Sequence, residues 1–156
     1  MTINEPTRQL VRRRANYLCE YCHSPEQSSS DIFTIDQLLP RSLGGSNAPD
    51  NLALACRRCN ERRYNFTTGI DPQTGEEVAI FNPRLQLWND HFIWINRGLI
   101  IIGTTPTGRA TCVRLDLNDQ FHNQGFIQES RQLWIKGGWH PPQEDLCLKS
   151  RLFPNF

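Results

Sequence analysis

The chain has 156 residues, six cysteines and a formal net charge of +1. This length allows one domain built in two parts and excludes two large domains. The near-zero charge excludes a global basic field that would attract polyanions, so any basic surface must be local. Fifteen of the seventeen cationic side chains are arginines, whose forked guanidinium suits contacts with phosphate groups.

Hydrophobic patterning and cysteine usage indicate the cellular compartment in which we expect the protein. No apolar run approaches the roughly 20 residues that span a bilayer, and the opening MTINEPTRQLVRRR lacks the apolar core of a secretory signal. Four of the six cysteines occur in CxxC pairs, a pattern typical of reduced, metal-binding thiols in cytosolic proteins. We therefore expect a soluble, cytoplasmic protein.

The first half of the chain predicts the order helix, strand, loop, strand, helix. Apolar residues at helical spacing predict a helix over 6–18, delivering the first CxxC pair. The β-branched and aromatic run 32–35 predicts a strand, and 52–55 predicts a second strand beyond a loop rich in Gly, Asn and Pro. Residues from Arg57 contain no helix breaker before Thr67, which predicts a second helix.

The second half of the chain contains all four tryptophans. We expect it to pack around the first half. Residues 67–77 read as a turn-rich connector. The runs 88–95 and 99–103 predict a β-hairpin that turns near Arg97 and Gly98. Helices are then expected over 106–117, although Gly108 weakens this one, and over 124–135, where two glycines end the pattern.

The two CxxC pairs predict a metal site. A separation of two residues lets both sulfurs of a pair face one metal, and two pairs complete a closed tetrahedral set of ligands. The four ligands are Cys19, Cys22, Cys56 and Cys59. Four sulfurs leave no position for water, so the expected ion is a structural zinc. Cys112 and Cys147 have no partner at metal-binding spacing and are expected to be small buried side chains.

A second candidate site lies among the polar residues between and just after the cysteine pairs. Asp36 lies near the end of the first predicted strand, Asn51 is in the loop, and Asn60 follows the last cysteine. Carboxylate and amide oxygens suit Mg²⁺ or a similar hard divalent ion better than zinc. Taken alone, the three residues fit ordinary roles better: a surface acid, a turn residue and a helix cap.

Together these motifs resemble the zinc-knuckle type of the HNH endonuclease family over residues 19–65. The family pattern is CxxC, a strand ending in Asp-His followed by Pro, then Gly-Gly, Asp-Asn-Leu and CxxCN. The chain has CEYC, TIDQLLPRSLGG, PDNLALAC and CRRCN in this order. The segments FNPR and HFIW further resemble small cyanobacterial-type members of the family.

The resemblance implies an α+β fold with a ββα-metal core, in which a zinc site of four cysteines links the elements. We expect residues 1–66 to form this HNH domain with its N-terminal helix. Residues 67–156 are expected to form a C-terminal elaboration of a hairpin and helices packed on it as one compact unit. The implied activity is cleavage of DNA by an activated water at a single divalent ion.

Carried over by position, Asp36 and Asn60 would hold a catalytic Mg²⁺ or Mn²⁺, and Asn51 would fix the loop. The position of the family's general-base histidine is occupied by Gln37. A glutamine amide can orient water but cannot take its proton near neutral pH. General-base help contributes about 10²- to 10⁴-fold, so we expect an enzyme slowed by that factor or inactive. His91 is the alternative source of a base, although packing against tryptophans is its expected role.

Two hypotheses follow. In the first, the chain is a metal-dependent DNA endonuclease whose phosphate contacts come from the arginines near the motif, namely Arg41, Arg57, Arg58, Arg62 and Arg63. In the second, it is a degenerate HNH domain retained as a nucleic-acid-binding or inhibitory module, with the zinc site and arginines intact. Arg63 and Tyr64 occupy positions where Lys and Gly are usual in the family, so the charge is kept but the close approach that Gly allows is lost. A zinc-linked interaction domain without a nucleic-acid role ranks third.

Overall fold

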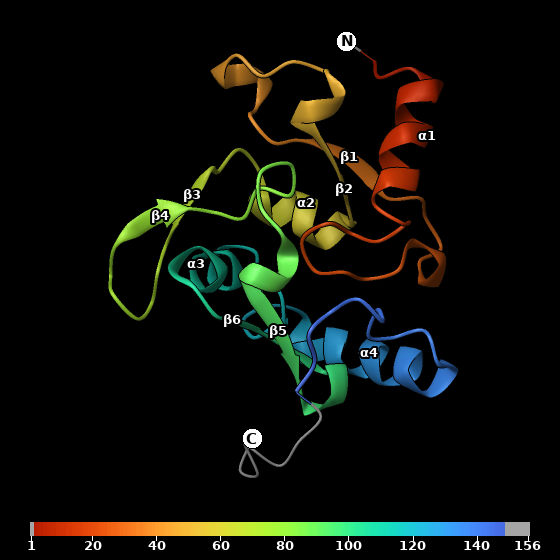
Figure 1. The fold of residues 1–156 in the computed structure, drawn as a ribbon, viewed down its shortest axis with the longest axis vertical. Coiled ribbons are helices and arrows are strands. Elements are labelled where there is room, and N and C mark those ends of the chain that lie inside the picture. The colour runs from red at the N-terminus through yellow and green to blue at the C-terminus, as the bar shows by residue number, and fades with distance from the viewer. Residues whose placement is uncertain (1, 149–156) are drawn as a thin grey trace. The chain divides into compact units, whose positions relative to one another are not determined.

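The computed structural model describes residues 2–148 and divides the chain into two compact units. Unit 1 consists of Met1–Thr67 and Asn82–Gln86, and unit 2 of Thr68–Phe81 and Leu87–Phe156. Both units mix helices with small two-stranded sheets (Figure 1), as the predicted α+β class requires. Within residues 2–148, no helix has the length and apolar character needed to cross a membrane.

Unit 1 is built from helix α1 (Glu5–Arg14), strands β1 (Thr34–Gln37) and β2 (Leu52–Ala55), and helix α2 (Arg57–Arg63). The two strands pair antiparallel, with Asp36 opposite Ala53. All four residues of β2 are buried, which explains its continuous apolar sequence LALA. This is the predicted ββα order, although α1 ends four residues before the expected boundary. The helix is followed by Asn16 and Tyr17, which both adopt positive φ.

Three charged side chains bind other segments of unit 1 to β2. Arg14 and Arg84 both donate to the carbonyl oxygen of Leu52, at 2.7 and 3.2 Å. Glu20 pairs with Arg84 and also accepts a hydrogen bond of 2.8 Å from the backbone amide of Leu54. The segment 82–86 therefore belongs to unit 1 through Arg84.

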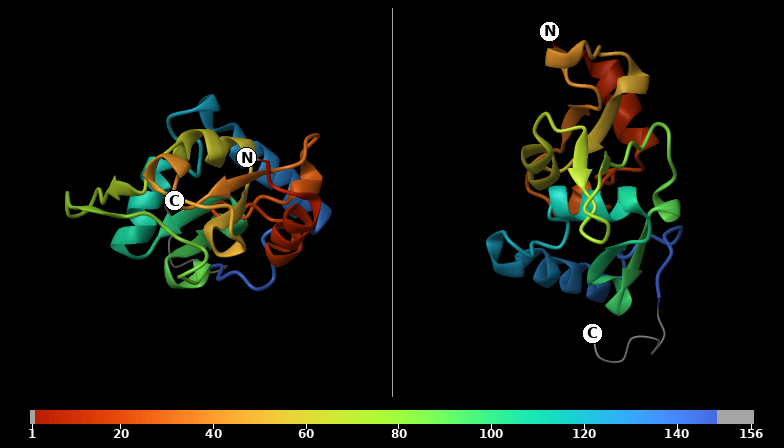
Figure 2. Two further views of the ribbon diagram at one scale, coloured as in Figure 1. Left: turned by 90° about the horizontal axis from the view of Figure 1, so that it is seen from above. Right: turned by 90° about the vertical axis from the view of Figure 1, so that its left-hand side faces the viewer.

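Unit 2 contains two antiparallel hairpins and two helices. Its elements are β3 (Thr68–Ile70), β4 (Glu77–Ala79), β5 (Phe92–Ile95), β6 (Ile100–Gly103), α3 (Pro106–Arg114) and α4 (Phe126–Gly137). The β3 and β4 hairpin can be followed in both panels of Figure 2. The expected connector at 67–77 was therefore wrong, because a turn at Asp71–Gly75 returns the chain to form a short sheet. The hairpin of β5 and β6 and both predicted helices are confirmed, with shifted ends.

The core of unit 2 gathers tryptophans around a buried arginine. Trp94 is fully buried, and the guanidinium of Arg131 lies 5.0 Å from its ring centroid. The ring of His140 meets Trp94 and Trp134 edge to face, with centroids 4.5 and 5.5 Å away. Arg131 also donates to the carbonyl oxygens of Leu99 and Leu117. These contacts make the aromatic residues of this unit packing elements.

Glu20 provides a test of the packing of unit 1. We expect Glu20→Gln to lower the free energy of unfolding by about 2 kcal/mol, because the substitution leaves the half-buried Arg84 without its anionic partner. Urea denaturation measures the change.

The matched control is Glu61→Gln, which removes the i,i+4 pair between Arg57 and Glu61. Both of its side chains are more than 60% exposed, so the cost should be at most about 0.5 kcal/mol. Equal effects of the two substitutions would contradict the role assigned to Glu20.

Candidate functional site

Four cysteines converge in the interior of unit 1. Cys19 and Cys22 follow α1, Cys56 caps the N-terminus of α2, and Cys59 lies in its first turn. All four are buried, and their sulfur atoms lie within 4.8 Å of one another. Sulfur atoms this close from two CxxC pairs can hold a metal ion.

Four thiolates in this buried cluster would need a cation to balance their charge. Burial raises the pKa of the Cys19 thiol well above its ordinary value, so this thiol resists ionisation. Hydrogen bonds from the neighbouring thiols, led by Cys19, lower the pKa of Cys22. The guanidinium of Arg58 lies 3.9 Å from the sulfur of Cys22. A single arginine cannot stabilise four thiolates, whereas a divalent metal can.

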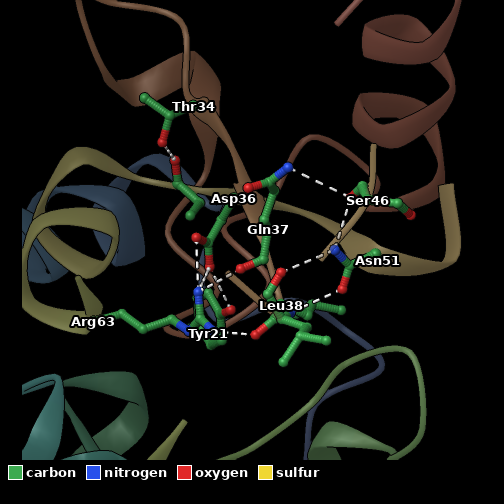
Figure 3. Close-up of polar contacts among 10 residues, drawn as sticks. Tyr21, Thr34, Asp36, Gln37, Leu38, Ser46, Asn51 and Arg63 are labelled. Carbon is green, nitrogen blue, oxygen red and sulfur yellow. Dashed lines mark hydrogen bonds and ion pairs between the residues drawn. The ribbon is translucent and has the colours of Figure 1, made fainter. Parts of the chain in front are cut away.

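Asn51 holds the loop between β1 and β2. Its amide nitrogen donates to the carbonyl oxygens of Leu39 and Ser46 at 3.1 and 2.7 Å, and its amide oxygen accepts from the backbone amide of Leu39 at 2.8 Å. Gly45 allows the loop to pass close to Leu39, since a Cβ there would lie 1.7 Å from that carbonyl oxygen. Gly45 and Asn51 thus contribute to one loop conformation, and Figure 3 shows Asn51 directed toward Ser46.

Asp36 is engaged by an interior ion pair. Nη1 of Arg63 lies 2.9 Å from both carboxylate oxygens of Asp36, and the hydroxyl of Tyr21 donates to Oδ2 at 2.7 Å. The side chains of Arg63 and Asp36 are only 3% and 7% exposed. Arg63 also donates to the carbonyl oxygens of Gln37 and Leu38. Figure 3 shows the guanidinium of Arg63 directed from α2 toward Asp36 and the end of β1.

The electrostatics of Asp36 follow from this burial. Desolvation raises the pKa of the carboxyl, and the positive charge of Arg63 and the Tyr21 hydrogen bond oppose the shift. The carboxylate therefore depends on Arg63 for its charge compensation. Asp36 and Asn60 were predicted to hold a hard divalent ion, but in this arrangement Asp36 already has Arg63 as its counter-cation. The site as built does not fit a second cation.

Gln37 points away from Asp36, as alternation along a strand requires. Its amide nitrogen donates to the side-chain oxygen of Asn47 at 2.7 Å, and the carbonyl oxygen of Ser46 lies at 3.5 Å. The amide of Gln37 is thus oriented by the same loop that Asn51 holds.

Gln37, Asp36 and Asn60 line one pocket of about 820 Å³ within unit 1. Asn60 contributes from α2, directly after the last cysteine. The pocket wall also includes Arg41, Asn47, Glu61, Tyr64 and Asn65. The structure therefore gathers the three positions around a single space, although it provides Asp36 with an internal partner.

The five arginines expected on the nucleic-acid surface separate into two groups. Arg41 and Arg57 are exposed, and Arg58 and Arg62 are half-buried. Arg63 was wrongly placed in this surface group, because its guanidinium is buried and bonded to Asp36 and two backbone carbonyls. An Arg at the usual Lys position was the only sequence signal for this difference. Tyr21, the other partner of Asp36, was not predicted.

The remaining candidate side chains have local partners in unit 2. The Nδ1 atom of His91 lies 2.6 Å from the Thr105 hydroxyl, and its ring packs edge to face on Phe81 with centroids 5.8 Å apart. Cys112 and Cys147 are half-exposed, not fully buried as expected. The buried position of the sulfur nevertheless raises the pKa of Cys112 to about 12, so this thiol is unreactive at neutral pH.

Comparison with known proteins identifies the domain that carries the site. Residues 19–66 match the sequence model of the HNH endonuclease family. This range begins at the first cysteine and ends just beyond α2, so it contains the four-cysteine cluster, strands β1 and β2, and the pocket residues from Asp36 to Asn65. No curated protein and no solved structure matches the chain significantly.

The cysteine cluster leads to a prediction about metal content and stability. We expect the purified chain to hold one metal ion in the cluster, and Cys59→Ser to lose it and lower the melting temperature of unit 1, because the ion joins the loop after α1 to α2. Elemental analysis and thermal denaturation measure the two effects. Cys112→Ser is the matched control and should retain the metal. Metal loss in both variants, or in neither, would contradict the assignment.

Proposed function

We propose that the HNH endonuclease domain of residues 19–66 binds nucleic acid and hydrolyses phosphodiester bonds slowly or not at all. The observation that carries this proposal is the interior ion pair between Asp36 and Arg63. Asp36 stands at the family position that would hold a catalytic divalent ion. Its carboxylate is instead committed to a guanidinium of the same chain.

The energetic argument concerns the replacement of Arg63 by an ion. A divalent cation at Asp36 would have to displace a guanidinium that is 3% exposed. Removing one partner of a buried ion pair typically costs about 3 to 5 kcal/mol, because the other charge is left uncompensated. The displaced Arg63 would also lose its bonds to the carbonyls of Gln37 and Leu38. Mg²⁺, which gives up its water reluctantly, is poorly placed to offset this cost.

Gln37 imposes a second and independent barrier to hydrolysis. Its amide has no titratable group near neutral pH, so it cannot accept the proton of an attacking water. The hydrogen bond to Asn47 fixes its orientation further. Loss of a general base alone costs about 10²- to 10⁴-fold in rate. In this proposal, the ion-binding position is occupied by a carboxylate already paired with Arg63, and the proton-accepting position is occupied by an amide.

The cysteine cluster is proposed to hold a structural zinc. Four thiolates in two CxxC pairs are the preferred ligands of Zn²⁺ and leave no position for a reacting water. The ion would join the loop after α1 to the first turn of α2 and so maintain the pocket. It would take no part in a reaction.

The proposed partner is DNA, contacted through its phosphates by the accessible arginines near the pocket. Arg41 lies on the pocket wall and is exposed. Arg57 is 82% exposed and Arg58 and Arg62 are half-buried on the same helix. Guanidinium groups form forked, charge-assisted hydrogen bonds with phosphate oxygens. With a net charge of +1 for the whole chain, the affinity must depend on these local contacts.

A nicking assay tests the loss of hydrolysis. With excess protein and Mg²⁺ or Mn²⁺, we expect no conversion of supercoiled plasmid above that given by Asn60→Ala. We expect Gln37→His to remain equally inactive, because it restores a base but leaves Asp36 paired with Arg63. Nicking by the natural chain that Asn60→Ala abolishes would show that the site does bind an ion and cleave.

Salt-dependent binding tests the contact with phosphates. We expect a fluorescently labelled DNA to bind at low salt, with affinity that falls as salt rises because counterions are released. Arg41→Gln should weaken binding and reduce the slope of log K against log salt by about 0.7 to 0.9 for each phosphate that the variant no longer neutralises.

Arg97→Gln is the control, since Arg97 is an exposed arginine of the hairpin turn in unit 2. Equal losses for Arg97→Gln and Arg41→Gln would assign the binding to general charge. Absence of binding to any DNA at low salt would contradict the proposed function.

A further inference from the structure

Four neutral amide side chains contribute to the polar wall of the pocket. Gln37, Asn47, Asn60 and Asn65 all line it. The charged groups around it are largely balanced, since Asp36 pairs with Arg63 and Glu61 pairs with Arg57. A phosphate group would need convergent cations. Amide side chains instead offer adjacent donors and acceptors, which match the edges of nucleobases.

Apolar residues and an aromatic ring complete the wall. Ile3, Ile35 and Pro40 contribute apolar surface, and Tyr64 stands beside the amides. A volume of about 820 Å³ is within the range of pockets that hold small organic molecules. The combination of apolar surface with hydrogen-bonding amides suits a planar heterocycle.

Tyr64 has a backbone conformation that tyrosine rarely adopts. It ends α2 with φ 50° and ψ −118°, in a region that glycine enters without strain. Its side chain is 69% exposed, so interior packing does not account for the strain. Phe66 lies nearby, with ring centroids 6.4 Å apart in an edge-to-face arrangement, and is itself 44% exposed. An exposed aromatic ring kept in a strained position at a pocket is a candidate for ligand contact.

From this juxtaposition we infer that the pocket accepts an unpaired nucleobase, which stacks on Tyr64 while the amides contact its edge. The inference rests on the proposed function and specifies it, because the bound nucleic acid would be single-stranded or locally unpaired. Stacking on an aromatic side chain is available to every base, whereas a base inside a duplex cannot present its face. Arg41, on the same wall, is then placed to contact the adjoining phosphate.

Binding to single strands and duplexes tests the inference on the metal-loaded full chain at low salt. The probes are a short DNA carrying one 2-aminopurine, the RNA of the same sequence, and the corresponding DNA duplex. We expect a single strand to bind more tightly than the duplex and its 2-aminopurine fluorescence to be quenched. Tighter binding of either the DNA or the RNA strand supports the inference and identifies the sugar preferred.

Tyr64→Gly separates a role in binding from a role in folding. It should keep or raise the melting temperature, because glycine accepts positive φ, yet weaken single-strand binding by about 5- to 150-fold. Duplex binding should be unchanged, and Tyr64→Phe should retain both affinity and quenching. The control is Phe121→Ala, which removes an aromatic ring of unit 2 that is 73% exposed and should leave binding unchanged.

Unchanged single-strand affinity and quenching in Tyr64→Gly would overturn the inference. If the inference fails in this way but salt-dependent binding of the duplex persists, the proposed function stands without the inference. If neither single strands nor duplexes bind, both the inference and the proposed function fail.

Discussion

The convergence of four cysteine sulfurs is the constraint on which unit 1 depends. Among its described residues, the unit has two short strands and two α-helices, and long loops connect them. The cluster joins the loop after α1 to the first turn of α2, and the strand pair lies between them in sequence. Asn60 immediately follows Cys59, so placing the sulfurs also places the amide that lines the pocket.

Arg63 then compensates the charge of Asp36, one of the residues that line the pocket. From the last turn of α2 it reaches Asp36 and two carbonyls at the end of β1. The same side chain therefore fastens the helix to the strand and neutralises the carboxylate. The buried pair of Arg63 and Asp36 would then have two effects: it would stabilise unit 1, and it would keep a divalent ion from Asp36, because a buried pair is costly to separate. In the proposed function, Gln37 at the expected general-base position would lack a proton acceptor without disturbing this arrangement.

An amide-lined pocket with an exposed tyrosine is a consequence of the same changes. Once the carboxylate is neutralised and the histidine position holds an amide, the wall offers hydrogen bonds in place of charge and proton transfer. In the inference drawn above, Tyr64 would add a stacking surface to this wall. The scaffold keeps its loop, held by Asn51, and presents a different chemistry within it.

The sequence predicted the parts of this structure that depend on spacing. Two CxxC pairs implied the cluster, and the breaker-free run after Cys56 implied α2. The resemblance to the HNH pattern implied that Asn51 fixes the loop. The partner of Asp36 was not predictable, because an arginine at a surface-like helix position reads as solvated. Its inward direction becomes visible only in the structure, where it bonds to Asp36 and to two carbonyl oxygens at the end of β1. The hairpin at 68–79 was missed because its turn residues dominate two strands of only three residues each.

The most direct test of the account is anomalous X-ray diffraction from crystals of the chain soaked in Mn²⁺. We expect an ion in the cysteine cluster, no Mn²⁺ peak in the pocket, and the guanidinium of Arg63 in contact with both oxygens of Asp36. An Mn²⁺ peak between Asp36 and Asn60, with Arg63 displaced, would contradict the account and identify an ion-binding nuclease site.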